Sequence, residues 1–169
     1  YYLYWLFLHY GPIPLLDKNI NINSELSEMT QYREKVDDVV DYIVKLLDEA
    51  INIDQGLPLY ITATTTELGR ITLPAAYCIK AKVLLTAASP LFNGNTDYAN
   101  FLDPRDNQPF FNQEKSMKKW QCAAEACKEA IQISEEGHHE LFTFKERVSF
   151  DLTPETELNM TLREIVTSR

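Results

Sequence analysis

The spacing of apolar residues along the chain predicts four helices joined by loops. Between residues 31 and 53, apolar side chains recur every three or four positions, which places them on one face of a helix. This stripe consists of Val36, Val40, Ile43, Leu47 and Ala50. The other three helices are predicted over residues 1–10, 72–88 and 116–134.

Prolines, glycines and capping residues set the ends of these helices. Gly11-Pro12 ends the first helix, and Pro90 ends the third because proline cannot continue a helix. Thr72 and Ser116 are the expected N-caps of the third and fourth helices, and Gly137 is the expected stop of the fourth. The segment around Pro12 and Pro14 is expected to be extended, because a residue before proline avoids the α region.

The faces of the helices predict how they pack. The segment YYLYWLFLHY is apolar on all sides, which is typical of a helix buried in a larger protein, and its Trp5 is expected in the core. The third helix is rich in alanine, which lets a neighbouring helix approach closely. The apolar stripe of the fourth is expected to be Trp120, Ala124, Cys127 and Ile131.

The segments between the helices are predicted to be loops. Residues 17–30 are rich in Asn and Ser, residues 62–66 carry a run of threonines, and residues 91–114 contain several Gly, Pro, Asn and Asp. A loop as long as 91–114 is uncommon in a compact domain and is often functional. Residues 136–144 are expected to turn and become extended, and the pattern over 160–166 fits either a strand or a helix.

These elements indicate a mainly all-α fold. Strands and helices do not alternate as they do in a parallel α/β sheet. Helices of this length with seams of small residues favour stacked helical pairs, and the Trp120 helix is similar to one tetratricopeptide unit. We therefore expect tetratricopeptide-like pairs with long loops, in one helical region over residues 1–169.

Composition and charge narrow the function classes. The chain has 169 residues, of which 45% are hydrophobic, and a net charge of −9, so it is expected to be globular and not to bind nucleic acid. The apolar opening segment is too short to span a bilayer and lacks the features of a signal peptide. We interpret the chain as an internal piece of a longer protein. Cys78, Cys122 and Cys127 do not form a disulfide framework and are expected to be buried as small apolar residues.

Four segments in order carry a resemblance to a known family. They are HYGPIPL (9–15), YREKVDDVVDYIVKLLDEAINI (32–53), GRITLPAAYCIKAKVLLTAASPLFNG (69–94) and KKWQCAAEACKEAIQI (118–133). Together they resemble the helical portion of the SusD/RagB family of outer-membrane nutrient-binding lipoproteins, up to about Phe144. Family members are several times longer, so the resemblance implies the tetratricopeptide-like part without the lipid-anchored N-terminus.

The resemblance implies a function without catalysis. Such a protein captures a glycan, as an oligo- or polysaccharide, or another nutrient at the cell surface and delivers it to a SusC-like TonB-dependent transporter. The implied location is the outer membrane, reached through a lipid anchor outside this chain, and no cofactor is implied. The helical face of the family contacts the transporter, so the polar face of residues 31–53 is expected to face that partner.

The loop 91–114 offers candidate ligand-binding residues. Sugar recognition combines a flat aromatic face with amide and guanidinium donors for hydroxyl groups. The candidates are Phe92, Asn93, Asn95, Tyr98 and Arg105. The alternative is a structured surface loop in which the Asn and Asp side chains hold turns.

No residue pattern indicates catalysis or a metal. Asp97, Asp103 and Asp106 do not have the spacing of a calcium loop, and His138-His139 lacks the spacing of a zinc site. No nucleophile motif is present, and no pair of carboxylates stands out. Two alternatives to glycan capture stay open: a helical-repeat scaffold that binds peptides, and a fragment of a glycoside hydrolase.

Overall fold

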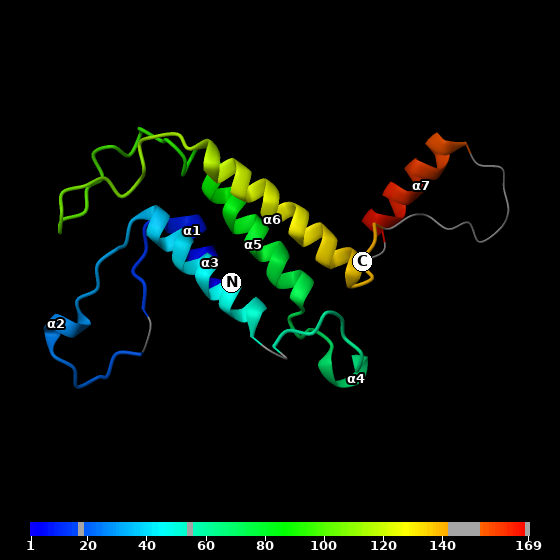
Figure 1. Ribbon diagram of the computed structural model, residues 1–169, viewed down its shortest axis with the longest axis horizontal. Helices are drawn as coiled ribbons and strands as arrows, with labels where there is room; N and C mark the ends of the chain where they lie inside the picture. Colours follow the sequence, from blue (N-terminus) through cyan, green and yellow to red (C-terminus); the bar gives the residue numbers. More distant parts are fainter. Residues whose placement is uncertain (17–18, 54–55, 142–152, 168–169) are drawn as a thin grey trace. The chain divides into compact units, whose positions relative to one another are not determined.

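The protein is helical throughout the part that its structure describes. The structure is a computed structural model that describes residues 1–16, 19–53, 56–141 and 153–167. These residues contain seven helices and no strand, apart from an isolated antiparallel bridge between Leu102 and Pro109 (Figure 1). The all-α prediction is confirmed. The chain divides into two compact units, Tyr1–Gly137 and His138–Arg169, and the expected single region over 1–169 stays a prediction.

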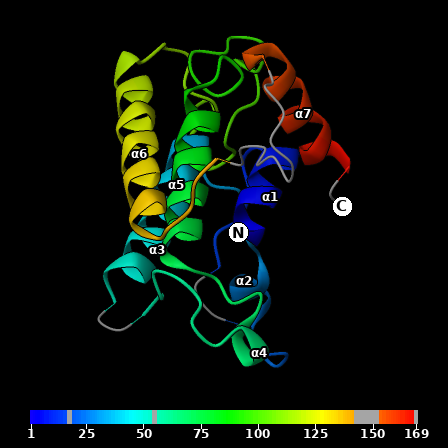
Figure 2. The same ribbon diagram turned by 90° about the vertical axis from the view of Figure 1, so that its right-hand side faces the viewer.

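Three helices form the frame of the first unit, and the central one runs antiparallel to the other two. They are α3 (Val36–Asn52), α5 (Leu73–Ala88) and α6 (Met117–Glu136), and α5 packs against each of the other two (Figure 2). The start of α5 lies beside the end of α6, where Cys78 Sγ is 4.0 Å from Ser134 Oγ. It also lies beside the end of α3, where Lys80 Nζ is 2.7 Å from Asp48 Oδ1. The pairing of neighbouring helices agrees with the expected architecture.

The second predicted helix begins later than its pattern indicated. α3 starts at Val36, and residues 31–35 are not helical. The backbone N–H of Glu34 donates to the carbonyl of Ile13 and that of Val36 donates to Phe110. Contacts with two distant segments therefore override the local tendency to continue the helix. The predicted stripe on α3 is otherwise confirmed, since Val36, Val40 and Ile43 are buried.

The predicted buried stripe of the fourth helix is wrong by one position. α6 has the predicted flanking residues, Ser116 before it and Gly137 after it, but it extends to Glu136, beyond the predicted end at Ser134. Its buried residues are Ala123, Ala126 and Ala130, whereas Trp120, Ala124 and Ile131 are exposed and Cys127 is half-buried. The backbones of α5 and α6 lie so close that only small side chains fit between them, so the largest apolar residues of α6 face outward.

The opening helix and the cysteines are less buried than predicted. Only Tyr4 and Phe7 of α1 (Tyr2–Tyr10) are buried, while Trp5 is 41% exposed because it lies on the side of α1 away from the core, where its ring contacts Tyr1 and His9. Cys78 is exposed, and Cys122 and Cys127 are half-buried, because α5 and α6 bury alanines and not these thiols.

Three further helices lie in segments predicted as loop or left open. α2 (Leu26–Met29) and α4 (Thr64–Glu67) are single turns with no buried residue. α7 (Pro154–Thr167) includes the undecided segment 160–166, which is helical. The expected extended stretch 136–144 is only partly described: Glu136 ends α6, Gly137-His138 is a turn, His138 and His139 are exposed, and residues 142–144 lie outside the described residues.

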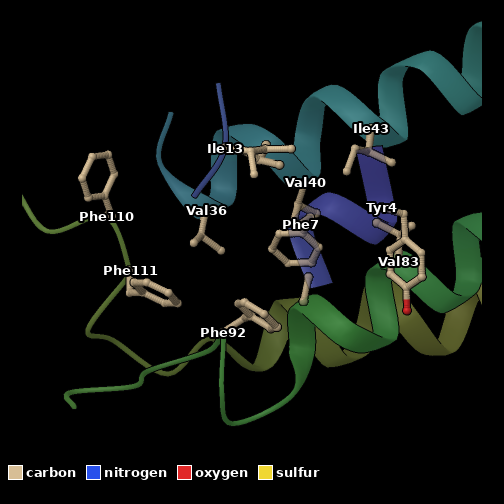
Figure 3. Packing of buried hydrophobic residues seen from close by; sticks show 12 residues of the cluster. Tyr4, Phe7, Ile13, Val36, Val40, Ile43, Val83, Phe92, Phe110 and Phe111 are labelled. Atoms are coloured by element: carbon tan, nitrogen blue, oxygen red, sulfur yellow. The ribbon is translucent and has the colours of Figure 1, made fainter. Parts of the chain in front are cut away.

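One apolar core joins α1, α3, α5 and the long loop. Tyr4 and Phe7 of α1 pack with Val36, Val39, Val40 and Ile43 of α3, and the loop inserts three phenylalanines (Figure 3). These are Phe92, Phe110 and Phe111. The loop is thus part of the core at both of its ends, which fixes its position on the helices.

Candidate functional site

The long loop leaves the helical frame and returns to it at the same place. The side chain of Asn93 is buried and bridges the two ends: its Oδ1 accepts from Ser116 N at 2.7 Å, and its Nδ2 donates to Ser116 O at 3.0 Å and to Ala88 O at 3.2 Å. Gly94 has φ +81°, and a Cβ there would lie 2.8 Å from the backbone nitrogen of Lys115. Only glycine permits the two ends of the loop to approach each other this closely.

A row of aromatic rings runs from the core to the surface of the loop. Phe7 packs on Phe92 at 4.5 Å between ring centroids, Phe92 stacks with Phe111 at 6.1 Å, and Phe111 stacks with Tyr98 at 4.8 Å. Tyr98 ends the row and is 46% exposed. Because its inner face rests on Phe111, its ring is held in place while the remaining surface faces solvent.

Arg105 fastens the middle of the loop to the segment before α3. Its Nη1 and Nη2 donate to the two carboxylate oxygens of Glu34, both at 2.8 Å, and Nη2 also donates to the carbonyl of Arg33. Its Nε and Nη2 donate to Asp103, whose carboxylate is almost fully buried. The Glu34 and Asp103 carboxylates raise the pKa of Arg105, and the hydrogen bonds from Arg105 hold the pKa of Asp103 below its usual value. Asp103 is therefore charged and paired at neutral pH.

A second ion pair lies beside this cluster. Lys35 Nζ donates to Asp106 Oδ2 at 2.6 Å. This bond lowers the pKa of Asp106 and raises that of Lys35. Both pairs join loop residues to the turn that leads into α3, so the loop and the start of α3 are held as one piece.

The five residues predicted to bind ligand have different places in this loop. Phe92 and Asn93 are buried. The ring of Phe92 and the amide of Asn93, which were predicted to contact a ligand, contact other parts of the protein instead. Asn95 donates to the carbonyl of Leu91 and accepts from the N–H of Asp97, and Arg105 is held by Glu34 and Asp103. Tyr98 alone of the five presents an aromatic ring to solvent. Ligand binding by these residues stays a prediction.

A pocket of about 310 Å³ lies where α3, α5 and α6 meet the end of the loop. Val40, Leu84 and Ala87 give it an apolar floor, and Asp41, Lys118 and Cys122 contribute to its rim. Lys119 closes one end by donating to Asp37 Oδ1 at 2.6 Å, and Asn112 donates to Asp37 Oδ2 at 3.2 Å. The pattern of residues along the chain does not reveal this pocket, because its walls come from three helices far apart in the chain.

Neither a metal centre nor a membrane span emerges from the described residues. Within residues 1–16, 19–53, 56–141 and 153–167, no three His, Cys, Asp or Glu side chains lie close enough to hold a metal ion. In the same ranges, no helix has the length and apolar character needed to cross a bilayer.

The chain is similar to one part of a longer protein of known structure. No protein-family model and no curated protein matches it. The solved structure of the Bacteroides thetaiotaomicron protein BT4246 matches with 33% identity and a TM-score of 0.73, over 90% of this chain and 28% of BT4246. The structure of selenomethionine BT4246 matches with 31% identity and a TM-score of 0.64, over 84% of this chain and 24% of the other. The chain thus spans about a quarter of the length of the structures it matches.

Proposed function

We propose that this chain is the helical portion of a SusD/RagB-type protein that captures a glycan or another nutrient at the outer membrane without chemically changing it. A SusC-like TonB-dependent transporter would receive the cargo. The observation that supports this most is the similarity to BT4246, at 33% identity over 90% of this chain. This similarity shows that the whole helical arrangement, and not one helix, recurs in a longer Bacteroides protein.

The residues that carry the family resemblance also build the structure. Gly11, in the segment HYGPIPL, has φ +64° and turns the chain after α1. Three residues at the end of the segment GRITLPAAYCIKAKVLLTAASPLFNG have structural roles. Phe92 inserts into the core, and Asn93 and Gly94 hold the two ends of the loop together. A resemblance that falls on residues with structural roles supports common architecture more strongly than one that falls on exposed positions.

The exposed end of the aromatic row is the part of the loop best suited to a sugar. A pyranose ring can stack its C–H face on an aromatic ring, and amide side chains nearby can bond its hydroxyl groups. Tyr98 offers such a ring, and Asn100 is exposed close to it in sequence. Capture would then depend on Tyr98, with Phe111 holding the ring behind it.

Affinity electrophoresis of the full-length parent protein on a panel of polysaccharides tests the proposal. We expect one polysaccharide to retard migration, and Tyr98→Ala to reduce the retardation. Tyr60→Ala is the matched control, because Tyr60 lies outside the loop and is exposed to a similar extent as Tyr98. Retardation by no polysaccharide would contradict glycan capture, and equal effects of the two variants would remove Tyr98 from the site.

The polar face of α3 is the proposed contact with the transporter. Asp37 and Asp48 already pair with Lys119 and Lys80, so charge reversal at either position would also disturb helix packing. Asp41→Lys tests this contact without breaking either of these two ion pairs. We expect it to weaken co-purification of the full-length protein with its transporter, and unchanged co-purification would remove this face from the proposal.

A peptide-binding scaffold is the second candidate. The observation in its favour is the pocket between α3, α5 and α6, which has the apolar floor and charged rim that a peptide side chain requires. Under this reading the full-length protein would bind peptides and be retarded by no polysaccharide.

A further inference from the structure

Three aspartates lie along the edge of the polar face of α3 that is nearest to α5 and α6. Asp37 and Asp48 each meet a lysine from a neighbouring helix, at 2.6 Å from Lys119 of α6 and 2.7 Å from Lys80 of α5. Asp41 lies one turn after Asp37. Within the described part of the chain, no hydrogen bond or ion pair engages its carboxylate. Asp41 is therefore the one of these three aspartates that has no lysine bonded to it in the described structure.

The side chains around Asp41 do not supply a cation for it. Lys119 is the lysine whose charge reaches Asp41, but its ammonium already donates to Asp37 and to the carbonyl of Phe92. Lys118, on the rim of the pocket, is exposed and forms no ion pair in the described structure. Partial desolvation, followed by the charges of Asp37 and Asp38, raises the pKa of Asp41. A cation beside Asp41 would offset that repulsion.

The pocket next to Asp41 has the volume and the lining residues to hold a long side chain. Val40 and Ala87 are buried and Leu84 is half-buried, and together they form an apolar floor in a space of about 310 Å³. Lysine and arginine lay their methylene groups along apolar surface while the charged end meets a carboxylate or water. A floor of aliphatic groups with an unpaired carboxylate at its edge matches both parts of such a side chain, whereas a free metal ion would need more oxygen ligands than Asp41 alone provides.

We propose that this pocket is a docking site for an arginine or lysine side chain of a partner protein, with its methylene groups over Val40, Leu84 and Ala87 and its charge on Asp41. The occupant is defined by charge complementarity with Asp41. The inference rests on the proposed transporter contact for Asp41 and names the side chain that the partner presents there, whereas glycan capture concerns a different surface, at Tyr98.

Titration of the full-length parent protein with blocked amino acids, followed by amide NMR shifts, tests this site directly. The probes are N-acetyl-arginine methylamide, N-acetyl-lysine methylamide and the uncharged analogue N-acetyl-norleucine methylamide. We expect saturable shifts at Asp41, Leu84 and Cys122 with the two cationic probes, and binding about fivefold weaker with norleucine, the scale expected for one partly exposed ion pair. Asp41→Asn should weaken the cationic probes to the level of norleucine.

Asp38→Asn is the matched control, because it removes the same charge from the same helix at a residue that does not line the pocket. We expect this variant to keep most of the preference for cationic probes. The proposal is overturned if no probe gives saturable shifts, if norleucine binds as well as arginine, or if Asp41→Asn and Asp38→Asn act alike. It is also overturned if binding appears only in Lys118→Gln, because Lys118 would then be the natural partner of Asp41.

Discussion

The guanidinium of Arg105 joins two parts of the first unit, the long loop and the segment before α3. It contacts Glu34 and Arg33 before α3 and Asp103 within the loop, and it lies 5.7 Å from the ring centroid of Tyr32. Its planar group makes several bonds at fixed angles, which an ammonium cannot reproduce. The loop conformation therefore depends on arginine at this position and not only on a positive charge.

Arg105→Lys should lower the melting temperature and loosen the loop. A lysine can pair with Glu34 or Asp103 but cannot bond both in the observed geometry, so a buried carboxylate loses donors. Thermal unfolding followed by circular dichroism measures the change. Arg70→Lys, which alters an exposed pair with Glu67, should change stability by less than about 0.5 kcal/mol. Equal effects of the two substitutions would contradict the role given to Arg105.

The Asp103 carboxylate should make stability depend on acid pH. Its pKa in the folded protein lies below the usual 3.8, because Arg105 stabilises the charged form. Its contribution is therefore fully present above the usual pKa and is lost as pH falls below it through the folded value. Asp103→Asn should be less stable than the native chain at pH 7, and the difference should shrink below pH 3.8 in thermal unfolding. A difference that is constant with pH would contradict this prediction.

The seam between α5 and α6 determines how these elements pack. Ala81 of α5 meets Ala126 and Ala130 of α6, with Tyr77 and Leu84 packed beside them. Small side chains let the two backbones approach closely, so most of the packing comes from backbone and Cβ atoms. A larger side chain has no space in such a seam.

Ala126→Leu should destabilise the chain by about 1–3 kcal/mol, the usual cost of overpacking a close contact. Ala124→Leu is the control, because Ala124 is exposed on the same helix and the chemical change is identical. We expect it to alter stability by less than about 0.5 kcal/mol. Chemical denaturation measures both variants, and similar losses in the two would show that the seam does not limit packing.

Sequence patterns predicted the helices well and their partners less well. The bounds of α5 and α6 follow from local signals such as Pro90, Ser116 and Gly137. The start of α3 does not, because hydrogen bonds to Ile13 and Phe110 replace the first turns. The buried face of α6 was missed because large apolar residues are usually the buried ones, and a seam of alanines reverses that rule.

The candidate site was predicted only in part. The loop 91–114 was recognised from its length and composition, and Tyr98 does present a ring to solvent. The inward roles of Phe92 and Asn93 depend on Phe7 and Ser116, which are distant in sequence. Residue types suited to binding a sugar are also suited to holding a turn, so composition alone does not separate the two roles.

At the scale of the whole molecule, one side of α1 presents a large apolar surface. The exposed large apolar residues here are Tyr1, just before α1, and Tyr2, Trp5, Leu6, Leu8 and Tyr10 of α1. Contiguous apolar surface of this kind marks a contact with other protein. The net charge of −9 acts in the opposite direction, because like charges keep copies of the chain apart.

The 169-residue chain should therefore self-associate, and more strongly as salt screens its charge. Sedimentation velocity over a range of concentration and salt measures this. The double substitution Trp5→Lys and Leu6→Lys should shift the chain toward monomer with little change in melting temperature, because both side chains are substantially exposed. Leu68→Lys is the control at an exposed leucine away from α1. A monomer under all conditions would contradict the prediction.

The junction at Asn93, Gly94, Lys115 and Ser116 has a consequence for where the chain tolerates insertions and deletions. Because these residues hold the two ends of the long loop together, a change in the length of the loop between them displaces neither α5 nor α6. Closing a longer loop adds little entropy cost, since that cost grows only with the logarithm of length. The largely exposed turn at residues 95–97 is therefore where the loop accommodates changes of length, because Tyr98, Arg105 and Phe110 hold the residues after it against the core and the start of α3.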